Sequence, residues 1–252
     1  MSRDRFILLA PEDSPATWAV KVTDDDTEGR FTLAEGRGSI QITLDDARDE
    51  FVYVLEGELD ARCDGRTHRL TAGMCALLPH GLVRDVSGTR AHLLRLSWPG
   101  TTDSRYVLGK SQARPGRIKV PPAFAAKART TDTGGTLSVM ETLVVNEIPR
   151  HIHHKADEGV YVLDGELTVE FDGETHTAAK GQFVLLPHGV RHALRPGSTP
   201  PPRVIQISAP GGWECFIEDL IEAGARSGTG GRLEPARLNP IAAKYDITYD
   251  EA

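Results

Sequence analysis

The sequence predicts an all-β protein made of two copies of one domain, with short helices near the C-terminus. Two stretches, Glu50–Val86 and Glu158–Leu194, align without a gap at an offset of 108 and share 18 of 37 residues. Repeat units in solenoid proteins run to about 20–50 residues, so an offset of 108 indicates a doubled domain. Within each copy, short apolar runs alternate with Gly and Pro turns, which favours a β-sandwich or β-barrel.

Turn signals in the second copy place its strands. Tyr161–Leu163 leads into Asp164-Gly165, and Thr168–Phe171 leads into Asp172-Gly173. Asp-Gly between short apolar runs is the strongest short-range signal for a β-hairpin. We therefore expect antiparallel strands on both sides of each dipeptide.

The next element in the second copy is a buried strand. Phe183–Leu186 is an apolar run that Pro187 should end. Gly189 follows two residues later and fits a turn that requires a positive φ.

The segment between the copies and the C-terminal segment complete the predicted organisation. Thr101–Gly135 is irregular and rich in Pro and Gly, so we predict two domains, residues 1–115 and 116–252. Apolar residues at helical spacing predict a helix over Trp213–Ala223 that packs on the second domain. Asn239 and Pro240 resemble the N-cap and first residue of a short helix that ends near Tyr245.

One segment of the second copy has the residues of a metal site. His151 and His153 are two apart on a predicted strand, so both imidazoles lie on the same face, roughly 6.6 Å apart at their bases. Glu158 follows after a polar bend, and His192 comes from the later run that contains Pro187. Three imidazoles and one carboxylate suit a divalent Mn, Fe, Co, Ni, Cu or Zn ion. We therefore predict one metal ion per chain, bound in the second domain.

The same positions in the first copy have different chemistry. They are occupied by Thr43, Asp45, Glu50 and Arg84. Arg keeps its proton in proteins and cannot be a metal ligand. We expect Arg84 to pair with Asp45 or Glu50 and the first domain to bind no transition metal, with a hard cation such as Ca²⁺ a minor alternative.

Composition restricts the partners and the compartment. The formal net charge of −7 argues against nucleic acid as a partner, and no apolar run reaches the ~18 residues of a membrane span. The N-terminal residues meet acidic side chains early and do not resemble a secretion signal. Three cysteines without a C-x-x-C pattern indicate reduced thiols and a cytoplasmic protein.

The two motifs of the second copy resemble those of the cupin superfamily. His151, His153 and Glu158 match H-x-H-x4-E, and Gly181, Pro187, Gly189 and His192 match G-x5-P-x-G-x2-H. Two non-ligand positions depart from the usual pattern, which has Gly where Val145 stands and Asn where Pro196 stands. With two copies, the chain resembles a bicupin, which implies two jelly-roll β-barrels with a metal inside the barrel.

The stretch from about Arg129 to Tyr245 is more narrowly similar to quercetin 2,3-dioxygenase-type cupins. This resemblance implies oxidation of a small enol or phenolic substrate, with Glu158 as both metal ligand and catalytic base. Val160, Val162, Phe183 and Leu185 are candidates to line the pocket.

Other functions stay open at this stage. The alternatives are a non-redox metal-dependent hydrolase, lyase or isomerase of a small metabolite, and a non-catalytic cupin that binds a small molecule. The two halves could pair internally in a monomer, or the chain could form a homodimer.

Overall fold

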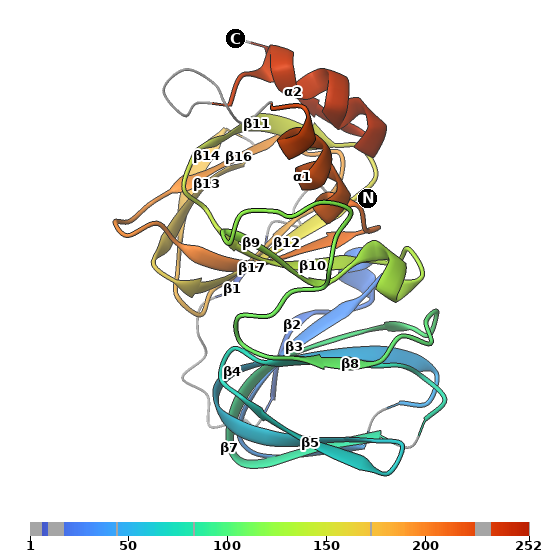
Figure 1. The fold of residues 1–252 in the computed structure, drawn as a ribbon. Coiled ribbons are helices and arrows are strands. Elements are labelled where there is room, and N and C mark those ends of the chain that lie inside the picture. Colours follow the sequence, from blue (N-terminus) through green and yellow to red (C-terminus); the bar gives the residue numbers. More distant parts are fainter. Residues whose placement is uncertain are drawn as a thin grey trace. The chain divides into compact units, whose positions relative to one another are not determined.

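The computed structural model describes residues 7–9, 18–43, 45–82, 84–171, 173–224 and 233–251. Most elements in these ranges are β-strands, and the few helices are short (Figure 1). The predicted all-β class with helices near the C-terminus is therefore confirmed.

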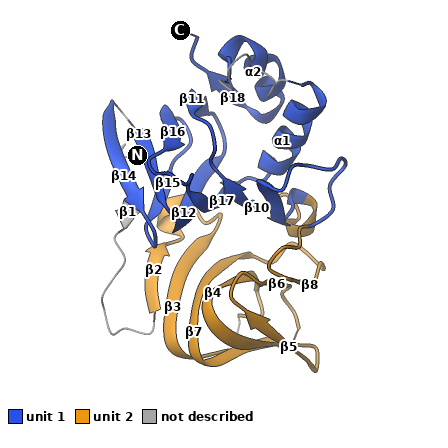
Figure 2. Cartoon of the chain, turned by 60° about the vertical axis from the view of Figure 1, so that its left-hand side comes forward, with its two compact units in different colours: residues 1–11, 114–130, 137–252 blue, residues 12–113, 131–136 orange. Residues whose placement is uncertain are grey.

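The chain forms two compact units, which Figure 2 shows in different colours. Unit 1 contains residues 1–11, 114–130 and 137–252, and unit 2 contains residues 12–113 and 131–136. These units cross the predicted boundary at residue 115 in two places. Strand β1 (Ile7–Leu9) pairs with β15 (Phe183–Leu186) of unit 1, and residues 131–136 belong with unit 2.

Unit 2 holds the first copy in one antiparallel sheet with the order β2-β3-β7-β4-β6-β8, and β5 pairs with β4. Its strands are β2 (Trp18–Val22), β3 (Thr32–Thr43), β4 (Arg48–Cys63), β5 (Arg66–Thr71), β6 (Cys75–Leu78), β7 (Arg84–Pro99) and β8 (Tyr106–Leu108), with the 3-10 turn η1 at Asp25–Thr27. Inward side chains of these strands form one apolar cluster that includes Val52, Val54, Leu70 and Leu93. Apolar side chains of this kind form a packed core.

Unit 1 holds the second copy in two antiparallel sheets. The six-stranded sheet has the order β1-β15-β12-β17-β10-β9, and the five-stranded sheet has the order β14-β13-β16-β11-β18. Neither order closes on itself, so each sheet is open rather than a hydrogen-bonded barrel. The remaining strands are β9 (Phe124–Ala128), β10 (Ser138–Leu143), β11 (Ile148–His153), β12 (Asp157–Asp164), β13 (Glu166–Phe171), β14 (Glu174–Ala179), β16 (His192–Pro196), β17 (Arg203–Ala209) and β18 (Ile247–Tyr249), with the 3-10 turn η2 at Thr130–Thr133.

Two of the predicted turns have the expected backbone. Gly165 separates β12 from β13 with a φ of 76°, and Gly189 follows Pro187 with a φ of 80°. Glycine adopts these left-handed conformations without the steric cost of a Cβ atom. Asp172, predicted to share the next turn with Gly173, lies outside the described residues.

The core of unit 1 shows which strand faces point inward. Val160 and Val162 of β12 pack with Val184 and Leu186 of β15 in one apolar cluster. Side chains alternate along a strand, so Phe183 and Leu185 lie on the other face of β15. Of the four candidate pocket residues, Val160 and Val162 therefore belong to this interior cluster, and Phe183 and Leu185 do not.

In the described part of the C-terminal segment, α1 (Trp213–Glu222) lies beside β10 and α2 (Pro235–Ala242) lies beside β18 (Figure 2). Helix α1 matches the predicted helix. Helix α2, extended by the 3-10 turn η4 (Ala243–Tyr245), begins earlier than predicted. Pro235 takes the first helical turn, and Pro240 lies inside the helix. Asn239 does not cap it, because its side-chain amide bonds both the N–H and the carbonyl of Tyr249.

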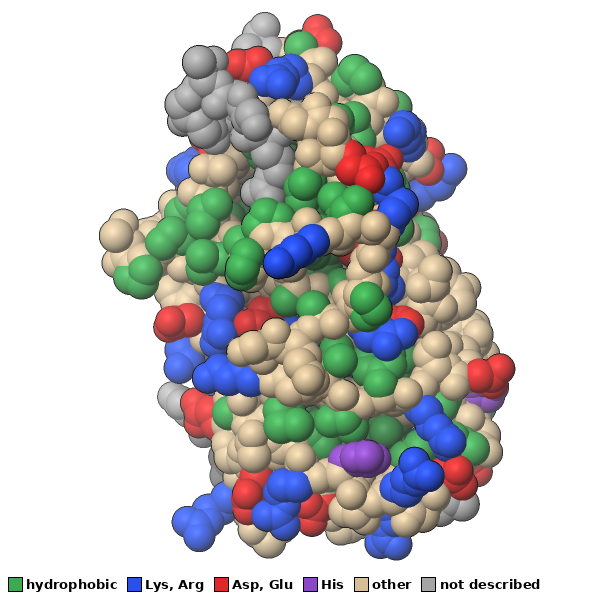
Figure 3. Space-filling view, viewed as in Figure 1, with side chains coloured by type: hydrophobic (Ala, Val, Ile, Leu, Met, Phe, Trp, Pro, Cys, Tyr) green, Lys and Arg blue, Asp and Glu red, His purple; other side chains and the backbone are tan. Residues whose placement is uncertain are grey.

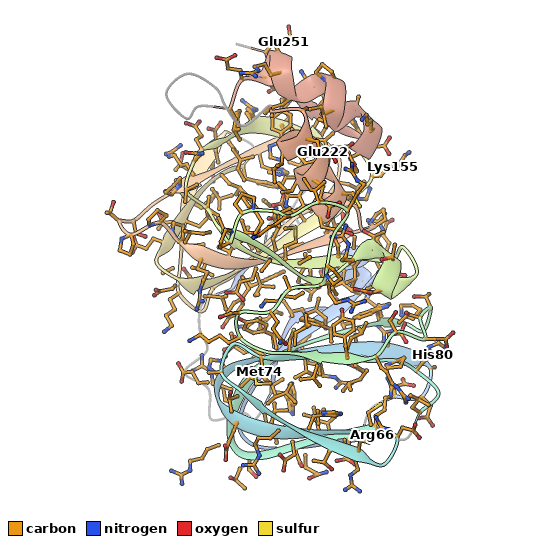
Figure 4. The ribbon with its side chains drawn as sticks, viewed as in Figure 1. Arg66, Met74, His80, Lys155, Glu222 and Glu251 are labelled. Carbon is orange, nitrogen blue, oxygen red and sulfur yellow. The ribbon has the colours of Figure 1, made fainter. Side chains whose placement is uncertain are left out.

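Ion pairs hold α1 to the segments on both sides of β9. Arg117 pairs with Asp219 and with Glu222, which is labelled on α1 in Figure 4. Arg129 pairs with Glu218, which is almost fully buried. These contacts fix the helix over the end of unit 1 that contains the candidate site.

The charges on the surface and the state of the cysteines match what the amino-acid composition suggests. In the face shown in Figure 3, Lys and Arg side chains are interspersed with Asp and Glu side chains among the described residues. None of the helices in the described ranges is long and apolar enough to cross a membrane. Cys63, Cys75 and Cys215, all among the described residues, form no disulfide.

Candidate metal centre

The structure brings His151, His153, Glu158 and His192 together in the interior of unit 1. One potential ligand atom from each side chain lies within 4.8 Å of the others. The four residues are between 0% and 3% exposed. Unlike the side chains of an exposed acidic cluster, these four have lost their contacts with water. Their polar atoms therefore need hydrogen bonds from neighbouring residues or a bound ion.

Local strand geometry explains the convergence. His151 and His153 project from the same face of β11, and His151 lies directly opposite His192 of β16 in the antiparallel register. Glu158 comes from β12 in the other sheet. The interior between the two sheets is therefore where the four side chains meet, as strand alternation predicted for the two histidines.

Backbone carbonyls orient two of the imidazoles. Nδ1 of His151 lies 2.8 Å from the carbonyl oxygen of Pro149, and Nδ1 of His192 lies 3.1 Å from that of Val190. A carbonyl only accepts hydrogen bonds, so each Nδ1 carries the proton. The Nε2 lone pairs are then directed to the centre of the cluster, which is the arrangement that a metal-binding His requires.

The central atoms are close and electron-rich. Nε2 of His151 lies 3.1 Å from Nε2 of His153, and Oε2 of Glu158 lies 3.2 Å from Nε2 of His192 and 3.3 Å from Nε2 of His153. Nitrogen and oxygen donors at such separations converge on one common point.

The pKa shifts favour ligands in their metal-binding protonation states. Burial, followed by the neighbouring His192 and His153, lowers the pKa of His151 well below its usual value. Burial also lowers the pKa of His153, although Glu158 opposes this shift. Burial raises the pKa of Glu158, but the close contacts with His153 and His192 lower it more, to well below the usual value. Neutral imidazoles and an ionised carboxylate are the forms that bind metal, so these residues fit a transition-metal ion.

Three further residues contact this cluster and were not predicted from the sequence. Gln206 on β17 donates a 2.6 Å hydrogen bond from Nε2 to Oε1 of Glu158. The Tyr249 ring stacks on His151 at a centroid distance of 4.9 Å, and the Trp213 ring lies 5.9 Å from that of His153. Burial and the nearby Glu158 raise the pKa of Tyr249, so its phenol stays protonated.

An apolar cavity adjoins the cluster through these three residues. Its volume is about 50 Å³, and all of its lining residues belong to unit 1. Phe216, Ile217 and Leu220 of α1 form one wall, and Val144 and Asn146 lie before β11 on another. None of the four residues predicted to line the pocket lines this cavity. The cavity lies at the end of the sheets that α1 covers.

Other histidines lie apart from this cluster. His154 bonds Thr248 at the surface, and His68 is exposed. His188 bonds Asp157 at 2.7 Å, and its counterpart His80 in unit 2, labelled in Figure 4, bonds Asp49 at 2.8 Å. The same Asp–His contact recurs in both copies, so it belongs to the shared scaffold.

The corresponding position in unit 2 is filled by Arg84. Its guanidinium is almost fully buried and donates to the backbone carbonyls of Leu78, Asp45 and Arg48. The expected pairing with the side chain of Asp45 or Glu50 is not what the structure has, because Glu50 instead binds Arg95. The side chain of Thr43 lies outside the described residues.

Comparison with known proteins identifies regions of similarity in both copies. The chain is 38% identical over 47 residues to quercetin 2,3-dioxygenase of Bacillus subtilis, a match that covers 19% of this chain and 14% of that enzyme. It is 37% identical over 68 residues to protein SchB of Streptomyces halstedii, covering 26% of this chain and 49% of that protein. The matched regions thus span half or less of these curated relatives.

Solved structures share the fold at low sequence identity. The structure of protein Ylba from E. coli has a TM-score of 0.64 and 14% identity, covering 82% of this chain and 92% of that one. The family model for the cupin domain matches residues 29–94 and 139–207, one match in each copy and together more than half of the sequence. The chain therefore belongs to the cupin family and carries two cupin domains.

Proposed function

We propose that this protein is a metal-dependent dioxygenase that acts on a small enol or phenolic molecule. The observation that carries the proposal is the buried cluster of three histidines and Glu158 beside an apolar cavity. A structural zinc site is closed and usually rich in Cys, whereas this set contains no Cys. The partial match to quercetin 2,3-dioxygenase supports oxidation of this kind.

His151, His153, Glu158 and His192 would hold one divalent Fe, Mn, Ni, Co, Cu or Zn ion. When bound, the ion would supply Lewis acidity and a template for substrate and dioxygen. Trp213 and the apolar residues of α1 line the adjoining cavity, so a bound substrate would displace water from it. Exclusion of water strengthens the electrostatic interactions of the site.

Glu158 is the proposed catalytic base as well as a ligand. Its carboxylate is ionised, and Gln206 fixes one of its oxygens. A carboxylate is a weak base, so it takes a proton more readily from an acidic hydroxyl than from an ordinary alcohol. Enols and phenols have such hydroxyls, and ordinary alcohols do not.

The cavity favours a small substrate. A volume of about 50 Å³ is well below the roughly 300–1,000 Å³ of pockets that hold drug-sized ligands. A three-ring flavonol would require α1 to move, whereas a compact enol of a few heavy atoms would require little rearrangement. We therefore place small enols ahead of flavonols within this proposal.

Oxygen uptake tests the proposal directly. Purified protein loaded separately with each candidate metal is mixed with small enols, simple phenols and a flavonol, and oxygen consumption is followed with an electrode. We expect uptake with at least one small enol or phenol, and loss of both uptake and bound metal in His153→Ala. His68→Ala is the matched control, because His68 is exposed and should leave both unchanged.

Absence of uptake with every substrate and metal would overturn the dioxygenase proposal. Turnover of a small metabolite without oxygen would then favour a hydrolase, lyase or isomerase that uses the same centre. Ligand binding without turnover would favour a non-catalytic small-molecule-binding cupin.

A further inference from the structure

The two copies differ at the position whose side chain contacts the glutamate that both copies share. Glu50 on β4 and Glu158 on β12 are equivalent in the repeat. In unit 2, Arg95 lies opposite Val52, two residues after Glu50, and in unit 1, Gln206 lies opposite Val160, two residues after Glu158. The backbone register therefore makes Arg95 and Gln206 equivalent.

In unit 2, Arg95 occupies both oxygens of its glutamate. Its Nε donates to Oε2 of Glu50 at 2.9 Å, and its Nη2 donates to Oε1 at 2.6 Å. The Glu50 side chain is completely buried. A bidentate guanidinium neutralises the carboxylate and leaves neither oxygen directed at another cation.

In unit 1, Gln206 occupies one oxygen only. Its Nε2 donates to Oε1 of Glu158 at 2.6 Å, and Oε2 faces His153 and His192. An amide carries no net charge, so it fixes the orientation of the carboxylate without neutralising it. The carboxylate keeps the negative charge that a divalent ion needs.

We propose that Gln206 is a positioning residue that reserves Oε2 of Glu158 for the metal, and that the exchange of Arg for Gln at this position helps to decide which cupin domain can bind metal. The inference rests on the proposed metal centre. Gln206 also lines the apolar cavity, so the same side chain joins the cavity wall to the ligand set.

The inference predicts graded losses of metal affinity. Gln206→Leu removes the hydrogen bond to Oε1, and loss of such a ligand-orienting partner typically weakens metal binding about 10–100-fold. Gln206→Arg should weaken binding more than about 100-fold, because the guanidinium would bind both carboxylate oxygens and would repel the incoming cation.

Metal titration of the full chain tests this order. Co²⁺ and Zn²⁺ affinities are measured by calorimetry and by Co²⁺ absorption for the wild type, both Gln206 variants and Arg203→Gln. Arg203 is the control, because it lies on the same strand but pairs with Glu141. We expect wild-type affinity in the control.

Thermal unfolding separates a positioning role from general damage. Without metal, Gln206→Arg should unfold at or above the wild-type temperature, because the new ion pair with Glu158 mimics the Arg95–Glu50 pair. Added metal should raise the midpoint of the wild type but not that of this variant.

If the wild type binds metal and Gln206→Arg binds it with an affinity within threefold of the wild-type value, this inference is overturned and the proposed function is left intact. If the variant unfolds well below the wild type without metal, the positioning role is also wrong. If the wild type itself binds neither ion, the metal-dependent function fails together with this inference.

Discussion

Arg84→Leu should destabilise unit 2 without changing metal binding in unit 1. Arg84 occupies the position equivalent to His192, and its guanidinium donates to three backbone carbonyls from inside unit 2. The side chain is 2% exposed, so little water can replace these bonds. Leu keeps most of the apolar volume of the stem while it removes every donor.

The magnitude follows from the bonds that are lost. Hydrogen bonds to a charged group contribute about 1.5–3 kcal/mol each, so three bonds represent roughly 5–9 kcal/mol. Removal of the buried charge also removes its desolvation cost, which is several kcal/mol. The carbonyl of Asp45 still accepts the N–H of Arg48 in the variant. A net loss of about 3 kcal/mol in the free energy of unfolding is the expected result.

Urea unfolding, monitored by tryptophan fluorescence and circular dichroism, measures this loss. At about 1–3 kcal/mol per molar urea, a loss of about 3 kcal/mol lowers the unfolding midpoint by roughly 1–3 M. Arg69→Leu is the control, because the ion pairs of Arg69 are exposed. A decrease below about 1 kcal/mol for Arg84→Leu, or a loss of metal binding in the folded variant, would refute the structural role assigned to Arg84.

Three further predictions concern acid stability, the cavity and metal removal. Burial raises the pKa of Glu35, but hydrogen bonds with His92 and Arg37 and the charge of Lys21 lower it more, from 4.5 to about 2. The ionised Glu35 therefore contributes about 2–3 kcal/mol to the free energy of unfolding. This contribution should be complete above pH 4.5 and lost as the pH falls towards 2. Urea unfolding at several pH values should show that Glu35→Gln flattens the fall in stability at acid pH. Trp213→Ala should enlarge the cavity, so that bulkier phenols gain in kcat/KM relative to small enols; an unchanged preference would contradict the cavity wall assigned to Trp213. A chelator should lower the thermal midpoint of metal-loaded protein, because metal at 100 times its Kd adds about 2.7 kcal/mol of stability; equal midpoints with and without chelator would argue against a bound ion.

The fold and the four clustered side chains were accessible from the sequence because their signals are local. The Gly turns and the two short motifs each lie within a few tens of residues, and the repeat is visible in a direct alignment at an offset of 108. Strand alternation then places His151 and His153 on one face, whatever the rest of the chain does. Similarly, the loss of imidazoles from the first copy is visible in a direct alignment.

The residues around the cluster were harder to predict because strand pairing and helix packing bring them there. Trp213 and Tyr249 reach the site from α1 and β18, which have no motif of their own. The strand face of Phe183 could not be predicted, because a short apolar run gives no alternation from which to read its orientation. Gln206 did leave a signal, since the repeat aligns it with Arg95.

The duplicated fold separates what the scaffold requires from what the centre requires. Both copies keep the buried glutamate and the Asp–His contact, so neither feature distinguishes a metal centre. The differences lie in the side chains near that glutamate. In unit 2 Arg95 binds Glu50, and Arg84 bonds backbone carbonyls instead. In unit 1 Gln206 and His192 both contact Glu158. A buried carboxylate must be neutralised by some cation. In unit 2 the Arg95 guanidinium is that cation. In unit 1 the Gln206 amide carries no charge, so the proposed metal ion would take this role.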